Sequence, residues 1–354
     1  MRKNYIDNIR WLVIMIVPFY HTTVIFNSFG LSFNINHPGV PAMDSFIFFF
    51  TSWLMPLLFV LAGISVYYAL KNRSAGQFFN NRLTKLLLPF TAGYILINPV
   101  QSYFTYKYHN DYTGSFFPSY LSFVADPNTI GQLWFLLELF FLSLIFLPLF
   151  MLLKKHGKFY NLCGKTRLWL LLLFYFPILG ASYLFNYPFP VFKTGLYGLL
   201  FLLGFFIFSF DSVIEQLSRF RKPLVVIAVF LNAFYAFSVV SQICGNTYLW
   251  TQILYYEKPV QMALCWITIL AVLAAAPKYL NFSNRFSAYM NKASFPVYIF
   301  HQSLLLLITD RVLHWNLPII LDYFVIGILC YIASFAAFEL VRRIPGLRYL
   351  FAIK

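Results

Sequence analysis

Ten long stretches of mainly apolar residues divide this chain, and they constrain its fold more than any other feature of the sequence. A helix needs about 20 apolar residues to cross the ~30 Å hydrocarbon core of a bilayer, and it satisfies its own backbone hydrogen bonds there. The stretches are 10–28, 46–70, 86–104, 131–153, 168–186, 195–210, 223–243, 259–276, 293–309 and 322–341. We therefore predict an all-α, polytopic membrane protein with about ten transmembrane helices, forming one integral membrane domain over residues 1–354.

The positions of the Lys and Arg residues predict the orientation of these helices. Of the 26 Lys and Arg residues, 22 lie in the two terminal segments and in every second connection. The other connections contain only Lys107, Lys193, Lys258 and Arg311. Because cytoplasmic segments carry the excess of Lys and Arg in membrane proteins, we expect both termini in the cytoplasm. The net charge of +15 then reflects topology, and no nucleic-acid partner is expected.

The composition excludes several other classes of protein. Only 10% of the residues are charged, against about 25% in a soluble domain, so an ordinary soluble enzyme and a disordered chain are both excluded. The four cysteines are widely spaced, at Cys163, Cys244, Cys265 and Cys330. This spacing indicates neither a disulfide framework nor a metal site, and no metal is expected.

Arg10 and His21 make the first span unusual. An ionisable residue inside a membrane costs several kcal/mol unless it is paired or solvated, so it suggests a functional site. The two residues are eleven positions apart, which places both on one helix face, ~17 Å apart along the axis. A cation at the cytoplasmic surface and an imidazole near mid-membrane favour a long, thin ligand. The alternative is structural, with Arg10 as a topology anchor and His21 as a hydrogen-bonded core residue.

Glu138 and His301 are expected at a similar depth, in the fourth and ninth spans. One carboxylate and two imidazoles at one level would form a buried site for proton transfer, in which the carboxylate orients or stabilises an imidazole. The alternative for both residues is structural pairing between helices.

Two segments outside the spans are also candidates. The predicted cytoplasmic segment 71–85 contains Lys71, Arg73, Arg82 and Lys85, which suit phosphate binding but which topology alone also explains. The predicted outer segment 105–130 is long enough to cover the outer mouth as a lid, or to be a simple connector.

Five short motifs follow one another along the chain. The first is Tyr5-Ile6-Asp7-Asn8-Ile9-Arg10 followed by His21, and the others lie at 55–63, 82–89, 133–136 and 294–301. Together they resemble the motifs of the acyltransferase-3 family of integral membrane acyltransferases. Ala62 stands where that family usually has Ser, and Lys85 where Arg is common. The opening is most similar to the branch that contains the membrane-glucan succinyltransferases called glucans biosynthesis protein C.

The resemblance implies an enzyme that transfers an acyl group, acetyl or alternatively succinyl, from cytoplasmic acyl-CoA to a hydroxyl of a glycan or another exported acceptor. It implies polysaccharide modification, such as O-acetylation, at the cytoplasmic membrane of a bacterium. The expected catalytic residues are His21, Arg10, Glu138 and His301, and the expected donor-binding residues are Arg10, Arg82, Lys85, Arg73 and Lys71. His21 would serve as general base or as transient acyl carrier.

A transporter or flippase of a lipid-linked saccharide is the main alternative function. Such proteins also bury titratable groups in the membrane and use them as proton relays. The sequence has no evident inverted repeat and no matched pair of interrupted helices, which disfavours this class. A non-catalytic membrane scaffold is a further alternative, but it would not need Arg10 and His21 on one face.

Overall fold

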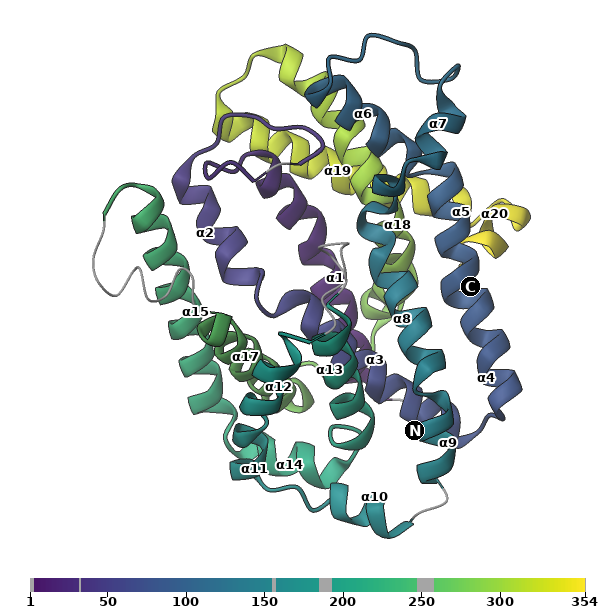
Figure 1. Cartoon of the computed structure of the whole chain (residues 1–354), viewed down its shortest axis with the longest axis vertical. Helices are drawn as coiled ribbons and strands as arrows, with labels where there is room; N and C mark the ends of the chain where they lie inside the picture. Colours follow the sequence, from purple (N-terminus) through teal and green to yellow (C-terminus); the bar gives the residue numbers. More distant parts are fainter. Residues whose placement is uncertain (1–2, 32, 155–156, 185–192, 247–257, 354) are drawn as a thin grey trace.

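The computed structural model describes residues 3–31, 33–154, 157–184, 193–246 and 258–353. These residues form a bundle of α-helices (Figure 1), so the predicted all-α class is confirmed. Five segments are long and apolar enough to cross a bilayer. They are α1 (Asn4–Ile25), α2 with α3 (Pro41–Phe50 and Leu54–Lys71), α15 (Arg221–Ile243), α17 (Lys258–Tyr279) and α19 (Ile319–Val341).

Three further segments reach spanning length only as pairs of helices bent by 42°, 41° and 101°. In the first, α4 (Ala75–Arg82) continues through a π-helical turn (Leu83–Leu87) into α5 (Leu88–Leu96), which precedes α6 (Pro99–His109). The others are α8 (Trp134–Ile145) with α9 (Leu147–Lys154), and α13 (Thr194–Phe206) with α14 (Asp211–Arg219). Counting each pair as one span gives up to eight spans in the part of the chain that the structure describes.

The two other expected spans, 168–186 and 293–309, coincide with helices of different character. The first corresponds to a shorter apolar segment made of α11 (Leu168–Leu173) and α12 (Tyr175–Ala181). The second lies within α18 (Arg285–Val312), which is 28 residues long but contains buried polar side chains. A protein with several membrane-spanning helices is thus supported, whereas the number ten and the side of the termini remain predictions.

The remaining helical segments are short and connect the longer ones. They are α7 (Tyr120–Ala125), a 3-10 segment at Pro127–Leu133, α10 (Gly157–Cys163), a 3-10 turn at Leu313–Trp315 and α20 (Pro345–Leu350).

The structure differs in detail from two expected segments. The expected span 46–70 lies within the candidate span Pro41–Lys71, but its helix is interrupted between α2 and α3, because Pro56 has no N–H for the carbonyl of Ser52 and its ring crowds that carbonyl. Helix α6 continues to His109, so the expected outer segment 105–130 begins as helix and also contains α7. The non-helical part of this outer segment is therefore shorter than expected.

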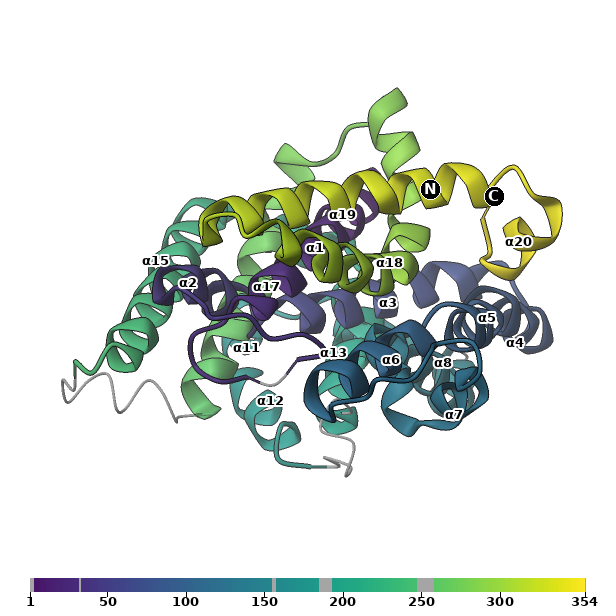
Figure 2. The same cartoon turned by 90° about the horizontal axis from the view of Figure 1, so that it is seen from above.

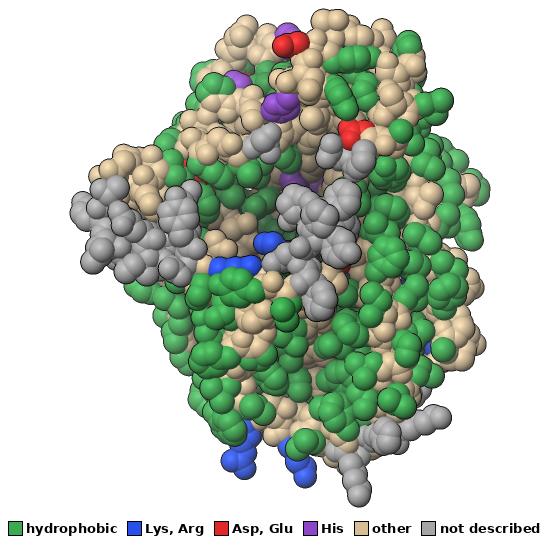
Figure 3. All heavy atoms as spheres, in the orientation of Figure 1, with side chains coloured by type: hydrophobic (Ala, Val, Ile, Leu, Met, Phe, Trp, Pro, Cys, Tyr) green, Lys and Arg blue, Asp and Glu red, His purple; other side chains and the backbone are tan. Residues whose placement is uncertain are grey.

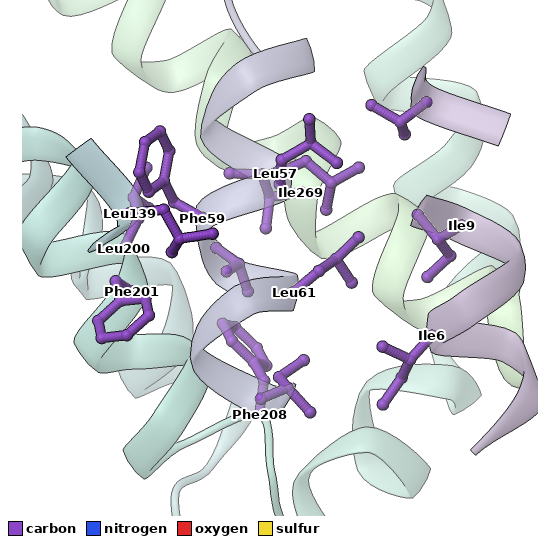
Figure 4. Packing of buried hydrophobic residues seen from close by; sticks show 14 of the residues in the cluster. Ile6, Ile9, Leu57, Phe59, Leu61, Leu139, Leu200, Phe201, Phe208 and Ile269 are labelled. Carbon is purple, nitrogen blue, oxygen red and sulfur yellow. The ribbon is translucent and has the colours of Figure 1, made fainter. Parts of the chain in front are cut away.

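Helices α3 and α13 form a closely packed central pair. A Cβ atom on Gly63 would overlap the carbonyl oxygen of Phe201, so the two backbones are in direct contact there. One turn earlier in both helices, Phe59 stacks on Tyr197 with ring centroids 4.3 Å apart. The later residue on α3 contacts the later residue on α13, so the two helices run in the same direction. Figure 4 shows the apolar side chains that pack around α3.

Helix α18 packs against α1, α19 and α6, and Figure 2 shows α1 and α18 beside each other beneath α19. This arrangement brings the first and ninth predicted spans together. In the space-filling view, apolar side chains cover most of the pictured face, and Lys and Arg side chains project from its lower end near α14 and the start of α15 (Figure 3). That end is the predicted cytoplasmic one.

Candidate functional site

A cavity of about 550 Å³ lies at the end of the bundle where α1 begins. Residues of α1, α3, the α4–α5 segment, α8 and α18 line it. Four of the lining residues are basic, namely Arg10, Arg82, Lys85 and Lys292, whereas Asp7 is the acidic residue among those described. The excess of positive charge suits the cavity to an anionic ligand.

Arg10 is held by two side chains at the edge of this cavity. One guanidinium nitrogen, Nη1, lies 3.0 Å from Oδ1 of Asp7, and Nη2 donates a hydrogen bond of 2.6 Å to Oγ of Ser65 on α3. The Arg10 side chain remains 34% exposed, so a ligand in the cavity can reach it. Asp7 and Ser65 were not among the predicted site residues, although the i, i+3 spacing of Asp7 and Arg10 is a recognisable pairing pattern.

Arg82 contributes a second guanidinium group to the cavity. It lies over the ring of Phe78, 4.5 Å from the ring centroid, and its Nε atom is buried without a hydrogen-bond partner. Arg82 is near enough to Arg10 and Arg73 for their charges to interact. No carboxylate is paired with Arg82 in the described ranges, so this positive charge is available to an anion.

The structure brings His21 of α1 and His301 of α18 together, with ring centroids 5.3 Å apart. The Nδ1 atom of His301 lies 2.7 Å from the carbonyl oxygen of Tyr298. A carbonyl oxygen only accepts, so Nδ1 donates, and the neutral ring keeps its lone pair on Nε2. Nε2 of His301 and Nδ1 of His21 are both buried without a hydrogen-bond partner. Two neighbouring imidazoles, each with a buried and unused nitrogen, can accept and return a proton.

An aromatic side chain contacts the histidine pair, and an amide side chain supports the turn of α18 that carries His301. Phe33, from the connection after α1, stacks on the His21 ring with centroids 5.6 Å apart. Gln132, just before α8, accepts a hydrogen bond from the Tyr298 hydroxyl through its backbone carbonyl, and its side chain donates to the carbonyl of Ile299 at 2.7 Å. These contacts fix the turn of α18 that carries His301. None of these contacts was predicted, since an isolated Gln in the sequence gives no signal of its own.

Gly131 makes this arrangement of Gln132 possible. Its φ angle of +43° lies in a region that residues with a Cβ atom rarely adopt. A Cβ atom there would also overlap the side chain of Gln101, whose Nε2 donates to Oε1 of Gln132 at 2.8 Å. The chain reverses into α8 at this point, and glycine is the residue that permits the turn.

The basic cavity ends short of the histidine pair. Its deepest described lining residues on the two helices are Ile14 of α1 and Pro296 of α18. His21 lies about 10 Å further along α1 and His301 about 7.5 Å further along α18, from the helical rise per residue. Buried side chains such as Val17 occupy the region between them. The charged and the titratable parts of the site are therefore aligned on the same helices but separated.

A family model for an acyltransferase domain matches residues 3–339, nearly the whole chain. The chain belongs to the acyltransferase-3 family. It is thus a membrane acyltransferase in the general sense, as the motifs predicted. The match does not select a branch of the family, and the similarity to glucans biosynthesis protein C stays a prediction. The comparisons with curated proteins and with solved structures gave no match.

The acyltransferase cavity lacks two of the expected donor-binding residues among its lining. Lys71 lies over the rings of Tyr67 and Tyr68, at 4.7 and 5.3 Å from their centroids. Arg73 donates a hydrogen bond of 3.3 Å to Oδ1 of Asn81. Both side chains are engaged near the cavity rather than in its wall, whereas Arg10, Arg82 and Lys85 line it.

Glu138 is placed apart from the two imidazoles of this acyltransferase. Its side chain hydrogen-bonds to Thr194 at the start of α13, and its Oε1 atom is buried without a partner. No contact of Glu138 with either histidine occurs among the described residues. Tyr197 lies near both Glu138 and Tyr20, the neighbour of His21. The expected carboxylate and imidazoles thus share a region of the molecule without a direct bond.

Proposed function

We propose that this protein is an O-acyltransferase that moves an acyl group, acetyl or alternatively succinyl, from cytoplasmic acyl-CoA to a hydroxyl group of a glycan or another exported acceptor. One observation supports the proposal above others: α1 and α18 both lead from the basic cavity to the histidine pair. Helix α1 carries Arg10 and His21, and α18 carries Lys292 and His301. We propose the cytoplasmic membrane of a bacterium as its location.

The cavity would hold the phosphates of the donor. Arg10 and Arg82 present planar guanidinium groups, which bind phosphate through paired hydrogen bonds, and Lys85 and Lys292 add positive charge. The pantetheine arm would then extend along α1 for the ~17 Å between Arg10 and His21. Donor binding would displace the side chains that close the space between Ile14 and His21.

The histidine pair would perform the transfer. One imidazole takes the proton of the acceptor hydroxyl, the hydroxyl oxygen forms a bond to the thioester carbonyl carbon, and the carbon–sulfur bond breaks. The proton then passes to the departing coenzyme A thiolate. His301 suits the role of base because its free Nε2 carries the lone pair. His21 serves beside it, either in proton transfer or as a transient acyl carrier.

Consumption of acetyl-CoA by the purified full chain in detergent, with membrane glycan extract as acceptor, tests this function. We expect release of coenzyme A thiol by the wild type and its loss in His21→Gln and His301→Gln. The matched control is His314→Gln, a histidine beyond the end of α18. A transporter or flippase would leave acetyl-CoA unchanged, and the same result for the wild type here would contradict the proposal.

A further inference from the structure

A short segment after α1, residues 33–36, lies across α6 and α18 beside the histidine pair, and we call it the strap. The Phe33 ring stacks on His21, and the backbone carbonyl of Phe33 accepts a hydrogen bond of 2.5 Å from Nε2 of His109 on α6. Ile35 is fully buried in a small apolar cluster with residues of α6 and α18. These contacts hold the strap in place next to His21.

Hydrogen bonds determine which way the Asn34 side chain of the strap is turned. Oγ1 of Thr105 donates its single hydrogen to the backbone carbonyl of Gln101 at 3.0 Å, so it accepts from Asn34 at 2.7 Å. The Gln101 carbonyl also lies 3.3 Å from the same nitrogen of Asn34, and a carbonyl oxygen only accepts. The NH2 group of Asn34 therefore faces α6, and its Oδ1 atom is directed at α18.

Gln302 of α18, the residue after His301, meets this Oδ1 atom. Its Nε2 atom donates to Oδ1 of Asn34 at 3.3 Å, because an amide oxygen in that place would face another lone pair. The other end of the Gln302 amide, Oε1, is then determined as well, and it is buried without a hydrogen-bond partner. Gln302 is only 3% exposed, and a polar atom buried this deeply normally has a partner. Gln302 thus presents an acceptor that no described residue uses.

Gln302 and the histidine pair have unused acceptors in the same part of the bundle. His301 precedes Gln302 on α18 and carries its lone pair on Nε2, which is also buried without a partner. The strap contacts both groups, since Phe33 lies on His21 and Asn34 on Gln302. Two such lone pairs require a ligand that supplies hydrogen atoms. A hydroxyl group supplies one, whereas a carboxylate has none to give.

The polar side chains around this acceptor are neutral. Nε2 of Gln101 donates to Oε1 of Gln132 at 2.8 Å and to Oγ of Ser303 at 3.3 Å. Further along α6 and α18, Lys107 and Asp310 neutralise each other across 2.5 Å. This part of the described structure is therefore suited to a ligand that is recognised by its hydroxyl groups and not by its charge.

We infer that Gln302 determines acceptor specificity: its Oε1 atom accepts a hydrogen bond from a second hydroxyl of the acceptor, while His301 takes the proton of the reacting hydroxyl. The inference rests on the proposed function in that it takes the ligand to be the acceptor. It adds the chemical class of the acceptor, an uncharged saccharide unit with at least two free hydroxyl groups. The acceptor would enter beside the strap, where His21, Phe33 and Asn34 are partly exposed.

Acetyl-CoA turnover by the purified full chain in detergent tests the inference, both with membrane glycan extract and with water as the sole acceptor. Gln302→Met keeps the length of the side chain and removes its amide. We expect the KM for the extract to rise about fivefold or more, as the loss of one hydrogen bond predicts. The KM for acetyl-CoA and the slow hydrolysis by water should stay unchanged, because neither depends on a second acceptor hydroxyl.

Gln261→Met is the matched control for this variant. Gln261 lies on α17, where its amide donates to the Tyr235 hydroxyl, so the control should keep the wild-type KM for the extract. Equal loss of hydrolysis and of transfer in Gln302→Met would assign Gln302 to support of the fold and overturn the inference. A wild-type KM for the extract in Gln302→Met would overturn it as well.

Binding of small probes tests the same subsite without any acyl transfer. The probes are methyl glucoside, with several hydroxyl groups, and tetrahydropyran-2-methanol, which keeps the ring and a single hydroxyl. With coenzyme A present and at equal concentration, methyl glucoside should raise the thermal unfolding midpoint of the wild type and of Gln261→Met more than the second probe does. The two probes should have equal effects on Gln302→Met. A preference that persists in Gln302→Met, or is absent from the wild type, would contradict the inference.

The two assays together separate this inference from the proposed function. Probe binding that depends on Gln302 without any acetyl-CoA consumption would leave the hydroxyl subsite standing and contradict the transferase proposal. Acetyl-CoA consumption, with a wild-type response of Gln302→Met to the extract and to both probes, would contradict the subsite alone.

Discussion

The basic cavity and the histidine pair share two helices but differ in almost every physical property. The cavity is open and carries four cations, with Arg10 one-third exposed at its edge. The histidine pair lies in a more enclosed region: Phe33 stacks on His21, Gln132 bonds to the turn of α18 before His301, and His301 is fully buried. Charge is thus concentrated where water reaches it, whereas His301 lies where water is excluded and His21 beside it is only partly exposed. Such a division suits recognition of a charged donor at one end and proton transfer at the other.

The largest effect should follow changes in the enclosed region. His301→Gln should reduce acyl transfer 100-fold or more, since an amide cannot accept the proton of a hydroxyl at neutral pH. Coenzyme A affinity, measured by calorimetry, should change little, because the cations proposed to hold its phosphates line the cavity, which ends before His301. His21→Gln should behave alike. Full transfer activity in both variants would remove the functional difference between the two regions.

A smaller effect should follow removal of a cavity cation. Arg82→Ala should weaken coenzyme A binding about tenfold or more, as the loss of a charged hydrogen bond to phosphate predicts. Arg73→Ala is the matched control, because Arg73 is engaged with Asn81 and does not line the cavity. Calorimetry on both variants measures the difference. An equal loss of coenzyme A affinity in the two variants would mean that the whole basic segment 71–85 binds the donor, rather than only the residues that line the cavity.

Arg10→Lys should raise the KM for the donor several-fold with little change in kcat. Lysine keeps the positive charge, but a single ammonium group cannot reproduce the planar fork that contacts Asp7 and Ser65 together. Steady-state kinetics with acetyl-CoA measures the effect. Wild-type kinetics in the Arg10→Lys enzyme would indicate that Arg10 serves only as a topology anchor.

The smallest expected effect concerns the support of the enclosed region. Gly131→Ala should lower the free energy of unfolding by about 1 kcal/mol or more, because alanine is strained at positive φ and its Cβ would meet Gln101. Gly76→Ala in α4 is the control, since a Cβ there meets nothing within 4 Å, and it should be neutral or slightly stabilising. Thermal unfolding in detergent compares the two. Equal midpoints would show that the turn before α8 tolerates a side chain.

Local periodicity was enough to predict several features of this protein. The helical class, most helical segments and the shared face of Arg10 and His21 follow from residues close together in the sequence, since one helix sets their relation. The break at Pro56 was accessible to the same reasoning but was missed. The family motifs were likewise local, and the match over residues 3–339 bears them out.

Only the tertiary structure decided which of these local features meet. His21 and His301 are 280 residues apart, and nothing in either helix states that they are neighbours. The same holds for Arg10 with Ser65 and for Glu138 with Thr194 rather than a histidine. A helix determines the direction of its own side chains through its backbone hydrogen bonds, whereas the partner of each side chain depends on how distant helices pack.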